Sequence, residues 1–272
     1  MAKIEKFNTI NSIMEKGDVP QEKRNYLGYS GVGGKCARKV WYSFRWADDV
    51  IIPRRVHRIF QRGDLEEERV INDLNRVGCT VSGAQREVVG ITGHARGHID
   101  GIAEGVPTAE KTPHLFECKT MKAAQYKKYL NEGLQRFNPA YWQQIHSYMG
   151  HLDLKRCLYV VVNKDTEERD FQRIEFSRDQ FEEGERTAFN IITSEEPPNK
   201  LPNASRSFFE CRICGYNDVC NSGKEVSRNC RTCKHWNIEE DGKFSCELYG
   251  EWLDRDKQLK GCESYELDKA YI

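Results

Sequence analysis

The stretch from Gly97 to Lys119 constrains the fold of this 272-residue chain more than any other. It holds two apolar-flanked runs: one ends at Asp100 and is followed by a glycine that can turn the chain, and the other reads Phe116-Glu117-Cys118-Lys119. Alternate residues of a β-strand point to the same side, so Glu117 and Lys119 are expected to share one face. The stretch therefore predicts two strands that carry two acids and a lysine.

These residue types indicate a particular chemistry. Carboxylates are the oxygen ligands that Mg²⁺ and Mn²⁺ prefer, and a neighbouring ammonium group can hold an attacking water or stabilise a developing phosphate charge. We therefore expect Asp100 and Glu117 to bind a divalent metal ion and Lys119 to assist the hydrolysis of a phosphodiester. A Glu-x-Lys pair is also common on exposed strands, so the rest of the chain must supply the context.

A helix is expected to begin near Gly63 and to stop at Gly78. At about 100° per residue, Glu67 falls within the apolar stripe of this helix and Glu68 falls well outside it. The stripe consists of Val70, Ile71, Leu74 and Val77. An acid on a buried face needs a partner, and a metal ion would supply one. Glu67 is therefore a further candidate for the site.

Strands are predicted for residues 86–102 and 115–119, with turns at Gly90, Gly93 and Gly97. The apolar run of residues 157–162 predicts a central strand, and residues 171–176 predict its partner. A polar lead, ending in a flexible glycine-rich segment, precedes Cys36. The alternation of apolar runs with helical patterns predicts an α/β fold.

Three further helices are predicted. One is rich in aromatic residues and follows Cys36, one runs from Lys119 to about Leu134, and one opens at Pro139. The apolar stripe of the third consists of Trp142, Ile145, Met149 and Leu152, and its adjoining flank of Tyr141, Gln144 and Tyr148. A capping box at Ser177 predicts a last helix, which ends before a domain boundary at residues 197–198.

The cysteines after this boundary have informative spacing. Three of them, in the pattern Cys211-x₂-Cys214-x₅-Cys220, are one short of a usual set of four, and Cys36 could complete it. The last four are Cys230, Cys233, Cys246 and Cys262. They suit a tetrahedral Zn²⁺ site, with His235 as a possible substitute ligand or, alternatively, a solvent-facing histidine. A zinc ribbon built from Cys211, Cys214, Cys230 and Cys233 also satisfies the spacing. Cys79, Cys118 and Cys157 are expected to be small buried residues.

Taken in order, these motifs resemble the PD-(D/E)XK nuclease superfamily, with Asp100 and Glu117-Cys118-Lys119 at the positions of its name. Gln144-x-x-x-Tyr148 resembles the Gln-x-x-x-Tyr motif of the RecB-like nucleases, which lies beside the DNA path. In that family a Gly-x-x-x-His motif places a histidine where Glu67 stands here, four residues after Gly63. The sequence departs from the family at that position.

The enclosing cysteines resemble those of the iron-sulfur RecB-like nucleases, including AddB and the CRISPR adaptation exonucleases. The resemblance implies that Cys36, Cys211, Cys214 and Cys220 hold a [4Fe–4S] cluster that ties the two ends of the domain together. It also implies a restriction-endonuclease-like core, with a mixed central sheet flanked by helices. We divide the chain into an N-terminal extension (1–35), a nuclease domain closed by an iron-sulfur cap (36–222) and a small Cys₄ zinc module (223–272).

The resemblance implies Mg²⁺- or Mn²⁺-dependent cleavage of DNA by an exonuclease that acts on single strands or duplex ends. It would serve replication or recombination, with proteins of those processes as further partners, in a bacterium or bacteriophage. Two alternatives remain: a non-catalytic DNA-binding accessory protein that keeps the fold, and a restriction-type endonuclease. The first would bind DNA without metal-dependent turnover.

The charge and composition of the chain limit where a DNA-binding surface can lie and what the cysteines can do. The formal net charge is zero, so a DNA-binding surface must be local. Candidates are residues 54–62, with four arginines and no acid, and the group Lys119, Lys122, Lys127 and Lys128. The sequence shows no apolar run long enough for a membrane and no signal-peptide pattern, so we expect a cytoplasmic protein. Eleven cysteines in a reducing compartment indicate metal ligation rather than disulfides.

Overall fold

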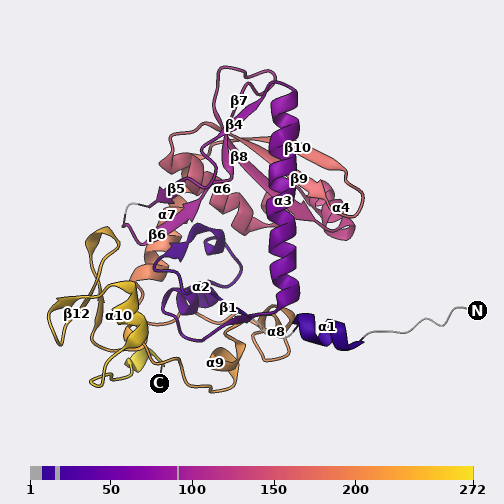
Figure 1. Cartoon of the computed structure of the whole chain (residues 1–272). Coiled ribbons are helices and arrows are strands. Elements are labelled where there is room, and N and C mark those ends of the chain that lie inside the picture. The colour runs from indigo at the N-terminus through magenta and orange to yellow at the C-terminus, as the bar shows by residue number, and fades with distance from the viewer. Residues whose placement is uncertain (1–7, 16–18, 91, 272) are drawn as a thin grey trace, which may run out of the picture.

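A five-stranded mixed sheet forms the centre of the computed structural model, which describes residues 8–15, 19–90 and 92–271 (Figure 1). The strand order is β10-β9-β8-β7-β4. Strands β8 and β9 are parallel, and the other neighbouring pairs are antiparallel. The bounds are β4 (Thr80–Ser82), β7 (Gly101–Glu104), β8 (His114–Met121), β9 (Arg156–Asn163) and β10 (Arg169–Glu175).

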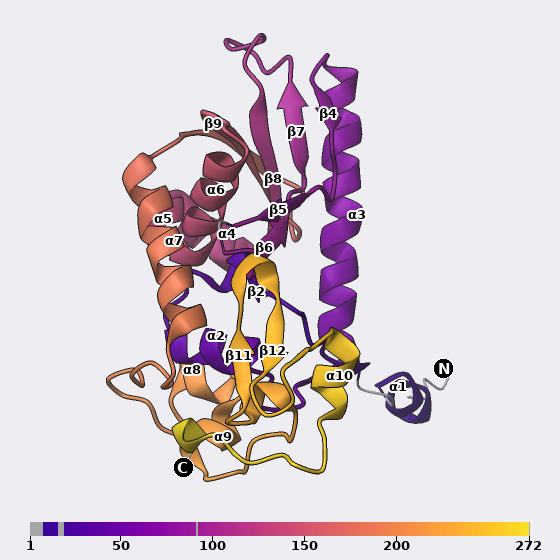
Figure 2. The same ribbon diagram turned by 90° about the vertical axis from the view of Figure 1, so that its left-hand side faces the viewer.

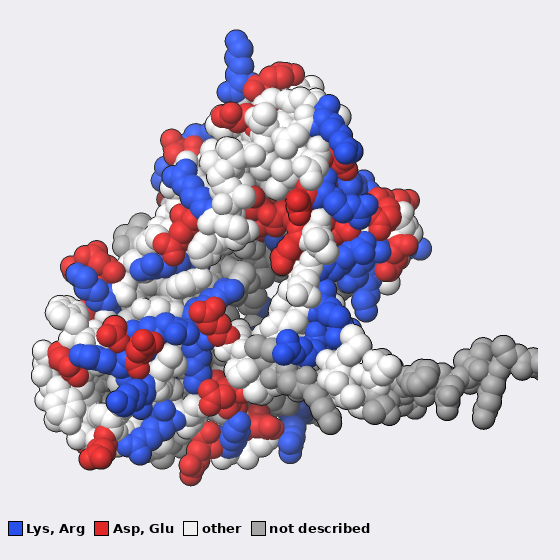
Figure 3. Space-filling model, in the orientation of Figure 1, with Lys and Arg blue, Asp and Glu red and all other residues white. Residues whose placement is uncertain are grey.

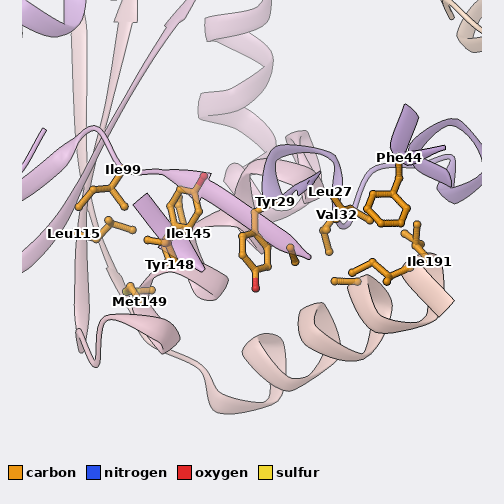
Figure 4. Close-up of a cluster of buried hydrophobic side chains, with 14 of the residues drawn as sticks. Leu27, Tyr29, Val32, Phe44, Ile99, Leu115, Ile145, Tyr148, Met149 and Ile191 are labelled. Carbon is orange, nitrogen blue, oxygen red and sulfur yellow. The ribbon is translucent and has the colours of Figure 1, made fainter. Parts of the chain in front are cut away.

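This sheet separates two apolar layers, because its inner strand β9 is buried on both faces. Cys157, Tyr159 and Val161 point into one layer, and Leu158, Val160 and Val162 point into the other. Helices α6 (Pro139–His151) and α7 (Arg178–Thr193) cover the first layer, part of which Figure 4 shows. Helix α3 (Arg54–Arg76) covers the second. The mixed α/β architecture and the central strand predicted from residues 157–162 are confirmed.

Helix α3 is longer than the sequence pattern predicted. It begins at Arg54 rather than near Gly63, and Gly63 lies inside it. A glycine inside a helix costs only about 1 kcal/mol relative to alanine, so it did not stop the helix. At the other end Val77 lies outside the helix and is 73% exposed, so its place in the buried stripe was wrong. The chain turns at Gly78, and this removes Val77 from the helical face.

A second, three-stranded sheet lies beside the first and contains the chain that leads into Asp100. Its order is β2-β6-β5, with bounds Leu27–Gly28, Ala95–His98 and Glu87–Val89. Gly97 lies within β6, so the turn predicted there was wrong. The glycine is required for space rather than for a turn, because a Cβ atom at this position would overlap the hydroxyl of Tyr148.

The glycine-rich lead before Cys36 was predicted to be flexible, and this was wrong for its last part. Leu27, Tyr29 and Val32 lie in the main core and are at most 2% exposed (Figure 4). Leu27 belongs to β2, which pairs with β6, and Tyr29 begins the short 3₁₀ helix η1 (Tyr29–Gly31). Apolar burial therefore orders a segment whose local composition is that of a loop.

The remaining elements surround these two sheets. Helix α2 (Ala37–Phe44) begins directly after Cys36, and Ser177 caps α7, as predicted. The N-terminal elements are α1 (Asn8–Glu15), β1 (Val19–Pro20) and β3 (Ile51–Ile52), and between β8 and α6 lie α4 (Ala123–Glu132) and α5 (Leu134–Phe137). The C-terminal elements are α8 (Phe209–Arg212), α9 (Asn217–Asn221), η2 (Cys230–Thr232), β11 (Trp236–Ile238), η3 (Glu240–Gly242), β12 (Phe244–Cys246), β13 (Glu251–Trp252), α10 (Arg255–Lys260) and η4 (Lys269–Tyr271).

The C-terminal segment packs directly against the N-terminal part of the chain. Figure 2 shows β11 and β12 beside β2 and β6. Arg231, which is 1% exposed, donates from Nη1 to the carbonyl oxygen of Phe44 at 2.6 Å, and its guanidinium lies 4.0 Å from the ring centroid of Trp46. Phe244 stacks on Trp236 in the same cluster. Within the described part of the chain, no helix combines the length and apolarity needed to cross a membrane.

Candidate active site

The two strands predicted from the stretch Gly97–Lys119 do bring its acids and its lysine together. Asp100 lies where the chain leaves β6 and enters β7, and its Oδ2 accepts a hydrogen bond from the backbone N–H of Cys118 at 2.8 Å. Lys119 Nζ donates to Glu117 Oε1 and lies 3.6 Å from Asp100 Oδ2. The ammonium group therefore bridges the two carboxylates.

Glu117 is the most deeply buried member of this group. It is 1% exposed, and its Oε2 has no hydrogen-bond partner among residues 8–15, 19–90 and 92–271. An unpaired buried carboxylate oxygen is costly, so it is a candidate ligand atom for a cation. Burial, and then the negative charge of Asp100, raise the pKa of Glu117 to about 7. Burial tends to lower the pKa of Lys119, but the negative charges of Glu117 and Asp100 have the larger combined effect and raise this pKa above its usual value.

Helix α3 presents two acids near the sheet, in different environments. Glu66 is 1% exposed and forms ion pairs with Arg62 at 2.7 Å and Arg69 at 2.8 Å. Glu67 is half-buried and faces the site: burial, and then the charge of Asp100, raise its pKa to about 7. The helical pattern identified Glu67 correctly as a partly buried acid near the site. It missed Glu66, whose burial depends on arginines one turn away on either side.

Helix α6 places the predicted Gln144 and Tyr148 next to this group. Both side chains are buried, and Gln144 Nε2 donates to the Tyr148 hydroxyl at 3.0 Å. The ring of Tyr141 lies 5.5 Å from Lys119 Nζ, so its π-face contributes to the surroundings of the ammonium group. Tyr141 was predicted on the same flank of the helix but without a role. Its position three residues before Gln144 is the signal that could have identified it.

The eight cysteines with informative spacing line two separate cavities. Cys36, at the start of α2, lines one of them with Cys211, Cys214 and Cys220. Burial, with a smaller contribution from the neighbouring Cys36 and Cys211, raises the Cys214 pKa. The first and last thirds of the chain therefore meet at these thiols.

The second cavity is lined by Cys230, Cys233, Cys246 and Cys262. Burial, and then the nearness of the other three cysteines, raises the Cys230 pKa to about 11. His235 also lines this cavity, with a side chain that is 18% exposed, and its Nε2 lies 3.3 Å from Oε1 of the largely exposed Glu266. Its role as a zinc ligand stays a prediction. Cys79, Cys118 and Cys157 are buried, as predicted.

The described side chains form no complete metal site by themselves. Across the described ranges, no three His, Cys, Asp or Glu side chains meet in an arrangement that could hold a metal ion. At Asp100 and Glu117 the physical reason is clear, because the Lys119 ammonium group lies between the carboxylates. The iron-sulfur, zinc and divalent-metal assignments, and the residues proposed for them, stay predictions.

A scan against protein-family models and a search of curated proteins each found no match. Among solved structures, the chain is similar to SSO0001 (TM-score 0.46, 16% identity, covering 79% of this chain and 97% of that one). It is also similar to LHK-Exo, an alkaline exonuclease from Laribacter hongkongensis (TM-score 0.45, 16% identity, covering 62% of this chain and 86% of that one). The structure of LHK-Exo in complex with dAMP gives a TM-score of 0.48 at 17% identity, covering 62% of this chain and 87% of that one. These likenesses are distant, and the function proposed below rests on the geometry of the site.

Proposed function

We propose that this protein is a divalent-metal-dependent DNA nuclease, and that it acts as an exonuclease on single strands or duplex ends. One observation carries the proposal: Asp100, Glu117 and Lys119 meet at the junction of β6, β7 and β8, with a buried oxygen of Glu117 left unpaired by the described residues. A site of this composition has little use in a purely structural role, because burying a carboxylate oxygen without a partner costs free energy.

The donor set fits Mg²⁺ or Mn²⁺. Asp100 and Glu117 offer hard carboxylate oxygens, and the half-buried Glu67 adds a third acid from α3. When bound, the ion would polarise a phosphate oxygen and lower the pKa of a bound water. Binding of a divalent ion to Glu117 would compete with the ion pair to Lys119. Once displaced from Glu117, the Lys119 ammonium group would be available to the substrate.

The chain's own groups have distinct roles in this proposal. Lys119 positions the attacking water or stabilises the developing negative charge on the phosphate. Its partial burial strengthens this interaction, because the field of a charge is screened less in a protein interior than in water. Gln144 and Tyr148, joined by their hydrogen bond, support the wall of the site beside the DNA strand. Glu67 is a further ligand or orients the water.

Lys119→Met and Asp100→Asn test the proposal. Asparagine keeps an oxygen that can accept the Cys118 N–H, so the fold should survive. Each variant should lower Mn²⁺-stimulated cleavage of DNA by about 100-fold or more, the order of loss seen when one charge-stabilising group is removed. Lys111→Met is the matched control, since Lys111 is exposed in the loop between β7 and β8 and belongs to neither proposed DNA-binding group. Full cleavage by both test variants would contradict the proposed site.

The form of DNA separates the proposed activity from its alternatives. An exonuclease should degrade end-labelled linear DNA and leave covalently closed circles intact. Cutting of the circles would indicate a restriction-type endonuclease. Salt-dependent binding without any metal-dependent turnover would indicate a DNA-binding accessory protein.

We further propose that Cys36, Cys211, Cys214 and Cys220 hold a [4Fe–4S] cluster. Four thiols that line one cavity, drawn from both ends of the chain, are the soft ligand set that such a cluster needs. We assign Zn²⁺ to the second set of four, at residues 230–262, for the same reason. The proposed division into an extension, a nuclease domain and a zinc module, with boundaries at residues 35 and 222, follows these two centres.

Metal analysis tests both assignments. Cys36→Ser should remove iron and brown colour from the purified protein and leave zinc in place. Cys79→Ser is the matched control. Cys79 is buried directly before β4, lines neither cysteine cavity and donates to the carbonyl oxygen of Gly105. Unchanged iron in Cys36→Ser would favour the alternative zinc ribbon, in which Cys211 and Cys214 share an ion with Cys230 and Cys233.

A further inference from the structure

Helix α3 carries a large exposed aromatic residue on the same face as Glu67. Phe60 lies seven residues before Glu67, which is about 700° of rotation and therefore only about 20° from the same direction. The two residues are separated by about 10.5 Å along the helix axis at 1.5 Å per residue. Val70 and Leu74, further along this face, are buried against the five-stranded sheet.

Phe60 is nevertheless 52% exposed. Figures 1 and 2 show the reason: the N-terminal half of α3 continues past the five-stranded sheet toward the C-terminal segment. The face that packs on β8 and β9 near Val70 therefore lacks this cover near Phe60. Figure 3 shows the molecular surface hollowed beside this half of the helix, with acidic atoms at the upper edge of the hollow.

Two neighbours of Phe60 suit contact with an extended ligand. Gly63 lies between Phe60 and Glu67 on this face, and a Cβ atom there would have no neighbour within 4 Å among the described atoms. A ligand can therefore approach the helix backbone closely. The ring of His57 lies 6.1 Å from that of Phe60 at an interplanar angle of 78°, an edge-to-face contact that holds the Phe60 ring in place.

The charge of this half of the helix selects the class of ligand. Residues 54–62 contain four arginines and no acid, and Arg54, Arg55 and Arg58 are exposed. Such a segment attracts a polyanion, while an exposed aromatic ring at its centre offers a π-face. Together these are the elements of a single-stranded nucleic-acid site, in which cations track the backbone and aromatic rings stack on bases.

We propose that Phe60 is a stacking platform for an unpaired base of the strand whose phosphate reaches Glu67, Asp100 and Glu117. This inference rests on the proposed nuclease function and specifies its substrate as a strand that is single-stranded over the nucleotides nearest the site. A separation of about 10.5 Å along the helix places the stacked base a few nucleotides from the scissile phosphate. In a fully paired duplex that base would be unavailable to the ring.

Binding is measured in the Asp100→Asn background without added divalent metal, so that cleavage does not interfere, by fluorescence anisotropy of a labelled single-stranded oligonucleotide. Phe60→Ala should weaken binding about tenfold, which corresponds to about 1.4 kcal/mol and lies within the range of base–aromatic stacking. Phe60→Trp, which keeps a π-face, should bind within about twofold of the parent. A blunt duplex of equal length should lose less than about twofold with Phe60→Ala.

Leu65→Ala is the matched control, because Leu65 is 58% exposed on the opposite side of the same helix, about 160° from Glu67. It should leave single-strand binding unchanged. Unchanged binding by Phe60→Ala, equal losses on duplex and single strand, or an equal loss in Leu65→Ala would each overturn the inference. These binding results are independent of turnover, so the absence of cleavage by the wild-type protein would refute the proposed function separately.

Discussion

Gly97 offers a sharp test of how the site is supported. It lies in β6, three residues before Asp100, and Tyr148 of α6 packs directly against its backbone. A Cβ atom at residue 97 would overlap the Tyr148 hydroxyl and would lie 2.8 Å from Cε1 and Cζ of the ring. Alanine can adopt this strand conformation, so any loss of stability in Gly97→Ala would come from crowding alone.

The expected magnitude follows from how firmly Tyr148 is held. Its ring is 2% exposed, its hydroxyl accepts from Gln144 at 3.0 Å, and it meets Tyr29 edge-to-face at 6.0 Å. A ring so enclosed cannot move away without disturbing other contacts, and overpacking of this kind costs about 1–3 kcal/mol. We expect Gly97→Ala to lower the free energy of unfolding by about 2 kcal/mol, and Tm by roughly 4–8 °C.

Urea unfolding of a double-mutant cycle is the assay. Tyr148→Phe alone should cost about 1 kcal/mol, the usual value of one hydrogen bond. Combined with Gly97→Ala, it removes the oxygen that the new methyl group overlaps but keeps the ring carbons. The double variant should therefore be more stable than the sum of the two single effects predicts, by at least about 0.5 kcal/mol. Additive effects of the two substitutions, or a Gly97→Ala cost below about 0.5 kcal/mol, would refute the crowding explanation.

Three further predictions concern groups buried elsewhere. Burial lowers the pKa of His146 to about 4 in the folded protein, whereas an unfolded histidine has a pKa of about 6.5. As the pH falls below about 6.5, the unfolded chain therefore binds the proton before the folded protein does. The free energy of unfolding that His146 contributes above pH 6.5 is lost as the pH falls toward 4. The free energy of unfolding should decrease between pH 7 and pH 5, and His146→Gln should make that decrease smaller by at most about 2 kcal/mol, measured by urea unfolding at both pH values. Arg231→Ala should cost at least about 3 kcal/mol, because it leaves its buried acceptors unpaired; a cost below about 1 kcal/mol would contradict the packing seen around it. Glu66→Gln should cost about 1–2 kcal/mol in thermal unfolding while Glu68→Gln, at an exposed position, stays within about 0.5 kcal/mol.

Local pattern determined much of this molecule. The unbroken apolar run at residues 157–162 predicted a strand buried on both faces, and the capping-box pattern at Ser177 predicted the start of α7. The period of two placed Glu117 and Lys119 on one side of β8. These features depend on neighbours within a few residues, which is why they could be predicted from the sequence.

The tertiary structure decided what depends on residues far apart in the chain. Glu67 faces the site, whereas Glu66 is neutralised by arginines, because α3 packs on the sheet in one particular rotation. Gly97 is a strand residue rather than a turn because Tyr148 occupies the space that a side chain would need. Cys36 shares a cavity with Cys211, Cys214 and Cys220 because the C-terminal segment returns to α2, a contact between residues separated by well over 150 positions. Local propensity carries no information about such contacts, since the free energy that favours them appears only when distant apolar and polar groups are buried together.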